Sequence, residues 1–227
     1  MSESNKQVET KVNSAINTFN LVSQTIFTQI INNKPVLKLF SHANNSNVII
    51  KNNTRDSLYQ MLLPTYKYLV RLNIKQLHFH LPNNESFLRF HRPNKFGDNL
   101  SNIRYSVKMA NKEKVVYTGF EEGRIYNGFR YVFPLSYQRQ HIGTVETSFS
   151  YEAINYQLKL LGIYYSTIAL KKEIVDEKVF EDEQKNYEES VFSEDYVLEK
   201  KFSHYNNDEG KSFRRIDIEI KNTYADR

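Results

Sequence analysis

The N-terminal part of the chain has the hydrophobic spacing of amphipathic helices. One apolar stripe recurs at steps of three and four residues, namely Val8, Val12, Ile16, Phe19, Val22, Ile26 and Ile30. This period predicts one long helix, which Asn32, Asn33 and Pro35 end. Pro35 can in turn open a short helix that runs to Phe40, because a helix start does not use the N–H that proline lacks.

A second helix is predicted after a loop over Asn44 to Asn53, with Thr54 as a candidate N-cap. Pro64 falls inside this helix and is expected to kink it. The apolar positions that define the helix are Leu58, Met61, Leu62, Leu69 and Leu72.

From Lys75 the apolar period changes to two, which predicts strands. The predicted strands are Gln76–Leu81, Ser86–His91, Val115–Phe120, Phe129–Leu135 and Ile142–Phe149. Turn-forming residues at Pro82-Asn83-Asn84 and at Tyr137–Gln140 favour hairpins, so the sheet is antiparallel. Between the second and third strands, Ser101 can cap a helix whose apolar face carries Ile103, Val107 and Ala110.

The C-terminal part predicts a smaller module. Ile154, Leu158 and Leu161 indicate a helix, and the next elements are a strand-like run over Tyr164–Leu170, a charged helix over Glu173–Lys185, a short helix that opens at Ser193 and a strand over 216–220. The fold class is therefore α+β, with a long N-terminal helix packed on an antiparallel five-stranded sheet and a smaller C-terminal α/β module. The expected divisions are 1–73, 74–150 and 151–227.

Charge and composition narrow the function classes. The net charge is +5, but Lys and Arg are scattered among acids, so we expect no nucleic-acid partner. Residues 89–114 lean basic, which favours an anion if a small ligand binds there. Cysteine is absent, which excludes disulfides and thiolate chemistry. No apolar run reaches the roughly 18 residues of a membrane span, although an excised ectodomain would look the same.

Three stretches in family order carry a resemblance to a known family. LHFHLPNNESFLRFHRPNKFGDNLSNIR (77–104), GFEEGRIYNGFRYVFPL (119–135) and HIGTVETSFS (141–150) resemble the double-Cache sensor domains, as does ALKKEIVDEKVFEDEQKNY (169–187). The resemblance implies a PAS-like sheet and an extracytoplasmic, membrane-anchored receptor domain that feeds a histidine kinase, a diguanylate cyclase or a chemoreceptor. In such relatives the ligand commonly lies over the sheet of a PAS-like module, and the receptors usually act as dimers.

Strand alternation groups the candidate binding residues. Leu77 and Phe79 share one face of the sheet, so His78 and His80 share the other. In the next strand Arg89 and His91 are likewise opposed to Leu88 and Phe90. If the apolar residues pack on the long helix, the histidines and Arg89 point to the far face, where a PAS-like domain has its pocket.

The later strands and turns add further candidates. Arg130 and Glu146 are charged residues on strands that should be buried, where each needs a partner. Arg89 or Arg130 is expected to bind a carboxylate, with Glu146 orienting an arginine or accepting from a ligand amine. The other expected ligand-binding residues are Tyr117, Tyr131 and Phe133 as pocket walls, and Asp98, which either contacts ligand or stabilises its turn. The alternative is an internal Arg–Glu pair with strand histidines that face water.

Metal and enzyme hypotheses have less support. His78 and His80 with His91 are compatible with Zn²⁺, but no Cys and no acid in matching register completes the set, so no metal or cofactor is expected. No G-x-S-x-G or H-E-x-x-H motif is present, and we expect no catalysis. Three hypotheses stay open: a receptor ectodomain, whose long helix is a candidate homodimer interface; a binding module without a membrane tether; and a metal-dependent enzyme.

Overall fold

The computed structural model describes residues 3–45, 47–123, 127–164, 166–190 and 193–201. The chain begins with three helices, and a π-helical turn (Phe27–Ile31) extends the first of them. These helices are α1 (Glu3–Ile26), α2 (Lys34–Phe40) and α3 (Val48–Arg71). As the sequence predicts, α2 opens at Pro35, and the side chain of Asn33 caps it by accepting a hydrogen bond from the Val36 N–H.

A five-stranded antiparallel sheet follows, in the strand order β2-β1-β5-β4-β3. Its strands are β1 (Ile74–His80), β2 (Ser86–Arg89), β3 (Tyr117–Glu121), β4 (Gly128–Tyr137) and β5 (Gln140–Phe149), and α4 (Tyr105–Glu113) lies between β2 and β3 in the chain. The β4–β5 hairpin turns through Gln138 and Arg139, which both have positive φ angles, as a tight two-residue hairpin requires. Asn84 has a positive φ angle in the predicted first turn.

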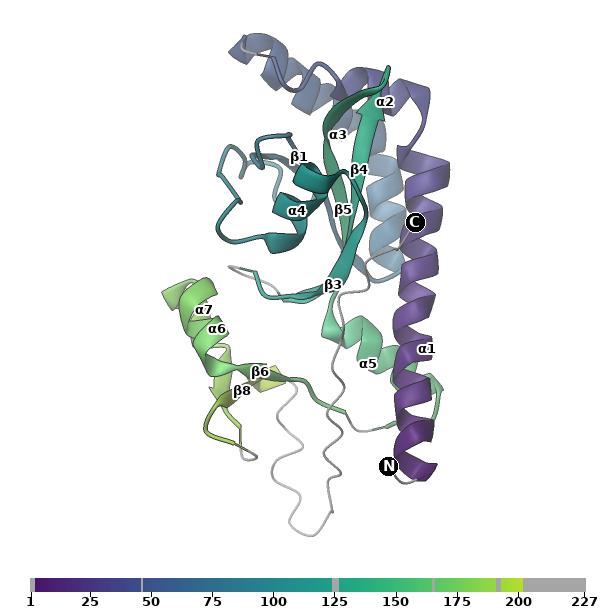
Figure 1. The fold of residues 1–227 in the computed structure, drawn as a ribbon, viewed down its shortest axis with the longest axis vertical. Coiled ribbons are helices and arrows are strands. Elements are labelled where there is room, and N and C mark those ends of the chain that lie inside the picture. The colour runs from purple at the N-terminus through teal and green to yellow at the C-terminus, as the bar shows by residue number, and fades with distance from the viewer. Residues whose placement is uncertain (1–2, 46, 124–126, 165, 191–192, 202–227) are drawn as a thin grey trace.

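Helices cover both faces of this sheet (Figure 1). On one face, Phe19 of α1 packs on Phe149, and the Thr147 hydroxyl donates to Ser23 Oγ across 3.0 Å. Helix α3 packs on the same core through Leu58, Leu62 and Leu69, which are buried. The opposite face is covered by α4, whose Val107 and Ala110 are completely buried. The polar strand residues of that second face are therefore enclosed between the sheet and α4.

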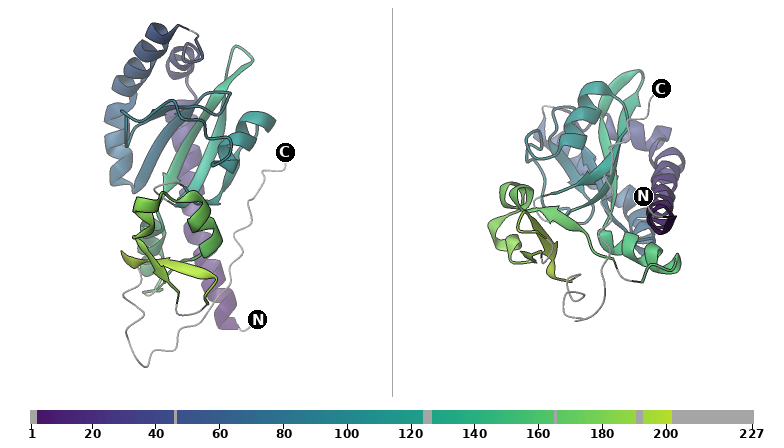
Figure 2. Two further views of the ribbon diagram at one scale, coloured as in Figure 1. Left: turned by 90° about the vertical axis from the view of Figure 1, so that its left-hand side faces the viewer. Right: turned by 60° about the horizontal axis from the view of Figure 1, so that its bottom comes forward.

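The C-terminal part forms a second, smaller module (Figure 2). Helix α5 (Tyr151–Leu160) comes first in the chain but packs on the main core through Tyr151, Ala153, Ile154 and Leu158. The elements of the smaller module are β6 (Ala169–Lys171), α6 (Lys172–Lys178), α7 (Glu181–Gln184), β7 (Tyr187–Glu189) and β8 (Tyr196–Glu199). The three strands pair in the order β6-β8-β7, and Leu170, Val175, Val179 and Val197 form a small core. The α+β class with a long helix, a five-stranded sheet and a smaller module is confirmed; the boundaries 1–73, 74–150 and 151–227 stay a prediction.

Several predicted helix starts are wrong. Helix α3 begins at Val48 with Asn47 as its N-cap, so Thr54 lies inside the helix and is buried. Pro64 lies inside α3, as predicted, and the helix runs from Val48 to Arg71; the kink at Pro64 stays a prediction. Helix α4 begins four residues after Ser101, with Arg104 at the N-cap position. The first turn of α3 is exposed, and the Asn47 side chain caps it by accepting hydrogen bonds from the Ile49 and Ile50 N–H groups, so a local cap sets this start.

The smaller module differs more from its prediction. Among the described residues of the run Tyr164–Leu170, only Ala169 and Leu170 lie in a strand, β6, and the charged helix is divided into α6 and α7. A turn and then β8 follow Ser193, so the short helix predicted there is wrong. The strand predicted over 216–220 lies outside the described residues. Within the described residues, none of the helices is both long enough and apolar enough to cross a bilayer.

Candidate ligand-binding site

The face of the five-stranded sheet that lies under α4 carries a buried polar cluster. Register places His78 of β1 opposite Arg89 of β2 on one side and Glu146 of β5 on the other, so the three side chains share this face. Arg130 of β4 joins them from the far side of β5. We call His78, His80, Arg104, Arg130 and Glu146 the polar cluster; each is at most 6% exposed.

Glu146 is the centre of the polar cluster, because both guanidinium groups donate to it. Arg130 Nη1 lies 2.7 Å from Glu146 Oε1, and Arg104 Nη2 lies 2.5 Å from Oε2. Arg104 Nε also donates to Glu121 across 2.9 Å. Two arginines and two glutamates therefore balance in charge, and the internal Arg–Glu pair considered as an alternative is present. The polar face is filled by the protein's own side chains.

Sequence reasoning missed Arg104 and Glu121. Arg104 immediately precedes α4, whose apolar face packs on the sheet, so its side chain is directed back over β5. The sequence did hold a signal for Arg104. An arginine stands at the start of an amphipathic helix, and that helix must cover the sheet face on which Glu146 lies. Glu121 ends β3 and also accepts hydrogen bonds from the N–H and the hydroxyl of Ser106 in the first turn of α4. These contacts fix the N-terminus of α4 above the cluster.

The electrostatics follow from burial and from these pairs. Burial by itself would raise the pKa of Glu146, but Arg104 and Arg130 hold that pKa at about 2. Burial lowers the pKa of His80 to about 3, with only Glu146 opposing it. The pKa of His78 is also lowered well below its usual range, first by burial and then by His80. Both imidazoles are therefore neutral at pH 7.

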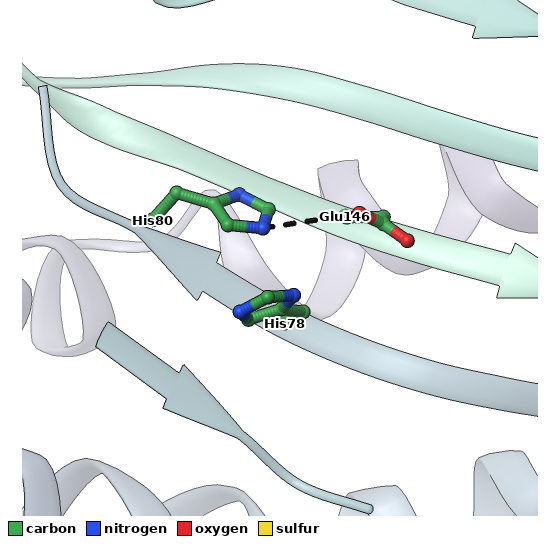
Figure 3. Close-up of side chains that lie close together, drawn as sticks. All are labelled: His78, His80 and Glu146. Carbon is green, nitrogen blue, oxygen red and sulfur yellow. Dashed lines mark ion pairs between the residues drawn. The ribbon is translucent and has the colours of Figure 1, made fainter. Parts of the chain in front are cut away.

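Each imidazole is held by one hydroxyl. His78 Nε2 lies 2.8 Å from Ser86 Oγ, and His80 Nδ1 lies 3.0 Å from Thr144 Oγ1. The two rings are 4.0 Å apart between centroids. His80 Nε2 has no hydrogen-bond partner among the described residues and points toward Glu146 Oε2, 3.8 Å away (Figure 3). The strand histidines do not face water.

Arg89 and Asp98 bind each other instead of meeting the cluster. Arg89 Nη1 and Nη2 donate to the two carboxylate oxygens of Asp98 across 2.7 and 2.8 Å, and Nη1 also donates to the Lys95 carbonyl. This bidentate pair closes the loop that follows β2. In the same loop, the Phe96 ring lies 3.6 Å from the Arg55 guanidinium carbon.

We expect Arg89→Gln to loosen this loop with little loss of global stability. The Asp98 side chain is 48% exposed, so the pair should contribute below about 1 kcal/mol to the free energy of unfolding. Hydrogen exchange followed by mass spectrometry should show faster exchange of the Lys95 and Gly97 amides and unchanged exchange in β5. Equal protection of the loop in both proteins would show that Arg89 does not hold it.

The predicted aromatic walls divide between the two faces of the sheet. Tyr131 and Phe133 lie on the α1 face, where the Tyr131 hydroxyl donates to the Ile16 carbonyl and Phe133 stacks on Phe27. The expectation that they line a pocket with Arg130 is therefore wrong, because alternate residues of β4 point to opposite faces. Tyr117 does lie on the α4 face, where its hydroxyl donates to Glu113 and its ring packs near Val132.

Two clefts lie beside the cluster. The smaller has a volume of about 200 Å³ and is lined by Tyr66, Val70, Lys75, Gln76, His91 and Arg92. Gln76 connects it to the cluster, because the Gln76 side-chain oxygen accepts a hydrogen bond from Arg130 Nη1. The larger, of about 490 Å³, separates β3 and α4 from the small module, and Glu121, Glu122, Lys171 and Tyr196 are among its lining residues. Of the predicted site residues, His91 lines the smaller cleft and Tyr117 lines the larger one.

Comparison with known proteins identifies one family. Residues 12–160 match the double sensory domain of two-component sensor kinases, dCache_3, which covers more than half of the chain. No curated protein matches the sequence.

Several solved sensor domains are similar at low identity. The sensor domain of the V. cholerae histidine kinase DctB is 13% identical over 74% of this chain and 64% of that chain, with a TM-score of 0.48. The isoleucine-bound sensory domain of the C. jejuni chemoreceptor Tlp3 is 13% identical over 74% and 66%, with a TM-score of 0.49. The chain thus spans about two thirds of the length of the solved domains it matches.

The family match runs without interruption from α1 through the five-stranded sheet to α5 and includes every member of the polar cluster. It confirms the resemblance to double-Cache sensors, and it excludes the metal-dependent enzyme among the three hypotheses because the family consists of sensor domains. The chain therefore belongs to the double sensory domain family of two-component sensor kinases.

Proposed function

We propose that this chain is the extracytoplasmic ligand-sensing domain of a bacterial transmembrane receptor and that its ligand is a small anion. Membership of a sensor-kinase family supports the sensing role. The observation that carries the anion is the smaller cleft, whose six lining residues include Lys75 and Arg92 and no carboxylate. A concave site with two cationic side chains attracts negative charge.

Neighbouring groups in the same cleft suit an anion as well. His91 Nδ1 is buried without a hydrogen-bond partner among the described residues, and burial lowers the pKa of His91 to about 4. The ring is therefore neutral at pH 7 and can donate one hydrogen bond without bringing charge. A volume of about 200 Å³ is smaller than the cavities that hold drug-sized molecules. A short carboxylate or an inorganic anion fits this space.

The cleft is placed to transmit binding into the sheet. Tyr66 and Val70 lie near the end of α3, Lys75 and Gln76 begin β1, and Arg92 follows β2. A ligand that bridges these segments favours one arrangement of α3 against the sheet, and Gln76 extends the contact to Arg130 in the cluster. A signal needs only a difference in ligand affinity between two arrangements of these elements.

A thermal-shift screen of short carboxylates, phosphate and sulfate tests the proposal. A ligand at a hundred times its Kd should add about 2.7 kcal/mol to the free energy of unfolding. We expect the double variant Lys75→Gln/Arg92→Gln to lose the shift of the best anion. The charge-matched control is the double variant Lys108→Gln/Lys112→Gln, which changes two exposed lysines of α4 outside the cleft residues. If the cleft variant kept the full response, or if the control lost as much, the cleft would not be the anion site.

The membrane anchor and the homodimer are further parts of this proposal. Most of the α1 stripe is used inside the chain, because Ala15, Phe19 and Ile26 are buried against the core, whereas Leu21 is 65% exposed. A dimer through α1 would therefore use the face that carries Leu21. The alternative of a binding module without a membrane tether predicts that no apolar spans flank this segment in its gene.

A further inference from the structure

We propose that the polar cluster holds a divalent transition-metal ion of the Zn²⁺ class, bound by His78, His80 and Glu146. One nitrogen from each imidazole and one carboxylate oxygen all lie within 4.8 Å of one another, and all three residues are buried (Figure 3). Two imidazoles and one carboxylate are a ligand set that Zn²⁺ accepts, with a fourth position left for water or another ligand.

Register supplies the acid that the sequence pattern lacked. Sequence reasoning placed no acid beside His78 and His80, because Glu146 is distant in the chain. In the structure β5 pairs with β1 so that Glu146 lies directly opposite His78 and Thr144 lies opposite His80. The two-residue spacing on β1 and the strand pairing together place two imidazoles and one carboxylate on one face, within the sheet and not on a flexible loop.

Each histidine is also oriented as a metal ligand commonly is. Thr144 and Ser86 hydroxyls bind the ring nitrogens His80 Nδ1 and His78 Nε2, which fixes the rings and leaves the other nitrogen of each for the ion. A buried polar atom without a partner, such as His80 Nε2, requires an explanation. If Nδ1 donates to Thr144, the Nε2 lone pair faces a carboxylate oxygen, and two electron-rich atoms then meet in a site without solvent.

A cation between these atoms resolves that arrangement, and the distances permit it. Two bonds of about 2.1 Å that span the 3.8 Å between His80 Nε2 and Glu146 Oε2 enclose an angle of about 130° at the ion, about 20° wider than tetrahedral. Two such bonds reach at most about 4.2 Å, so ligand atoms at the 4.8 Å limit of this cluster must approach by at least about 0.6 Å.

The positive charges of the two arginines repel a bound cation and therefore lower the affinity of the site for it. Arg104 and Arg130 both donate to Glu146, and a carboxylate oxygen can accept a hydrogen bond while it also binds a metal. The cluster with Glu121 is neutral before the ion binds, so the ion adds net positive charge. Removal of one guanidinium should therefore strengthen metal binding, whereas it should weaken the binding of any anion to the cluster.

Titration of chelator-treated, tag-free protein with Zn²⁺ alone, and with Co²⁺ as a spectroscopic substitute, tests the site. We expect one ion per chain, the visible absorption of tetrahedral Co²⁺, and no response to Mg²⁺ or Ca²⁺, which prefer oxygen ligands. His80→Ala should reduce affinity at least about tenfold, since one of three protein ligands is lost. His141→Ala is the matched control. His141 also lies on β5, but its Nε2 is hydrogen-bonded to Asn111 of α4, away from the three proposed ligands.

Arg104→Gln keeps the test decisive if His80→Ala does not fold. It retains all three ligands, and we expect it to bind Zn²⁺ at least about tenfold more tightly than the unmodified chain. The proposal is overturned if no ion binds, if His80→Ala binds as well as His141→Ala, or if Arg104→Gln binds more weakly. The metal titration does not use the anion cleft, and the anion screen can be repeated on chelator-treated protein, so the failure of one proposal leaves the other unaffected.

Discussion

Replacement of Glu146 by alanine is expected to lower the free energy of unfolding by about 3–5 kcal/mol. Glu146 is completely buried and accepts hydrogen bonds from Arg104 and Arg130, both of which are almost fully buried. Without the carboxylate, Glu121 alone must balance two guanidinium groups that water cannot reach. Urea denaturation of both proteins at pH 7.5 measures the difference.

An ion pair nearer the surface is the control for this variant. Lys51 and Glu85 lie 2.6 Å apart with side chains 21% and 18% exposed, and Glu85→Ala should cost below about 1 kcal/mol. The double variant Glu146→Ala/Arg130→Met should lose less stability than the two single losses added together, because it removes a pair and not one partner. A Glu146→Ala protein within about 1 kcal/mol of the original would mean that the cluster is open to solvent.

Acidification from pH 6 to pH 5 is expected to lower the free energy of unfolding by about 2–3 kcal/mol in chelator-treated protein. The pKa values of His80 and His91 are lowered to about 3 and about 4, and that of His78 is also far below the usual value of 6.5. Below pH 6.5 the unfolded chain therefore binds three protons that the folded chain does not. Stability is present above this pH and is lost as the pH falls.

One buried carboxyl acts in the opposite direction. Burial raises the pKa of Glu122 to about 7, so between pH 7 and pH 4.5 the folded chain binds a proton that the unfolded chain does not. The difference is about two protons, each of which changes the free energy of unfolding by about 1.4 kcal/mol per pH unit. His91→Gln should reduce the slope by about one proton. Equal stability at pH 7 and pH 5 would contradict the burial of these imidazoles.

Local patterns in the sequence were sufficient to predict most of the first module. The period-three-and-four stripe of α1, the break at Asn33 and Pro35, and the period-two strands from Lys75 onward each depend on neighbours in the chain, and each agrees with the structure. The smaller module was harder because its strands are three or four residues long. Strands that short hold little periodicity, and their pairing with β8 decides where they form.

The candidate site was harder to predict, because it is formed by contacts between residues that are distant in the sequence. Alternation correctly placed His78, His80 and Arg89 on one face, but it does not say which charged groups meet across a sheet. Arg89 pairs with Asp98, nine residues later in the chain, whereas Glu146 accepts a hydrogen bond from Arg104, which immediately precedes α4. Tyr131 and Phe133 were assigned to the pocket wall because they are aromatic. They follow Arg130 by one and three residues, so strand alternation already directed them to the opposite face of the sheet, toward α1.

The central claim is that a small anion enters the basic cleft at the start of β1 and contacts the sheet there. Amide chemical-shift mapping with the best anion from the screen tests it most directly. The largest changes should fall on Lys75, Gln76, His91 and Arg92, with smaller ones along β1. Changes confined to the small module, or to the exposed faces of α1 and α3, would contradict the account.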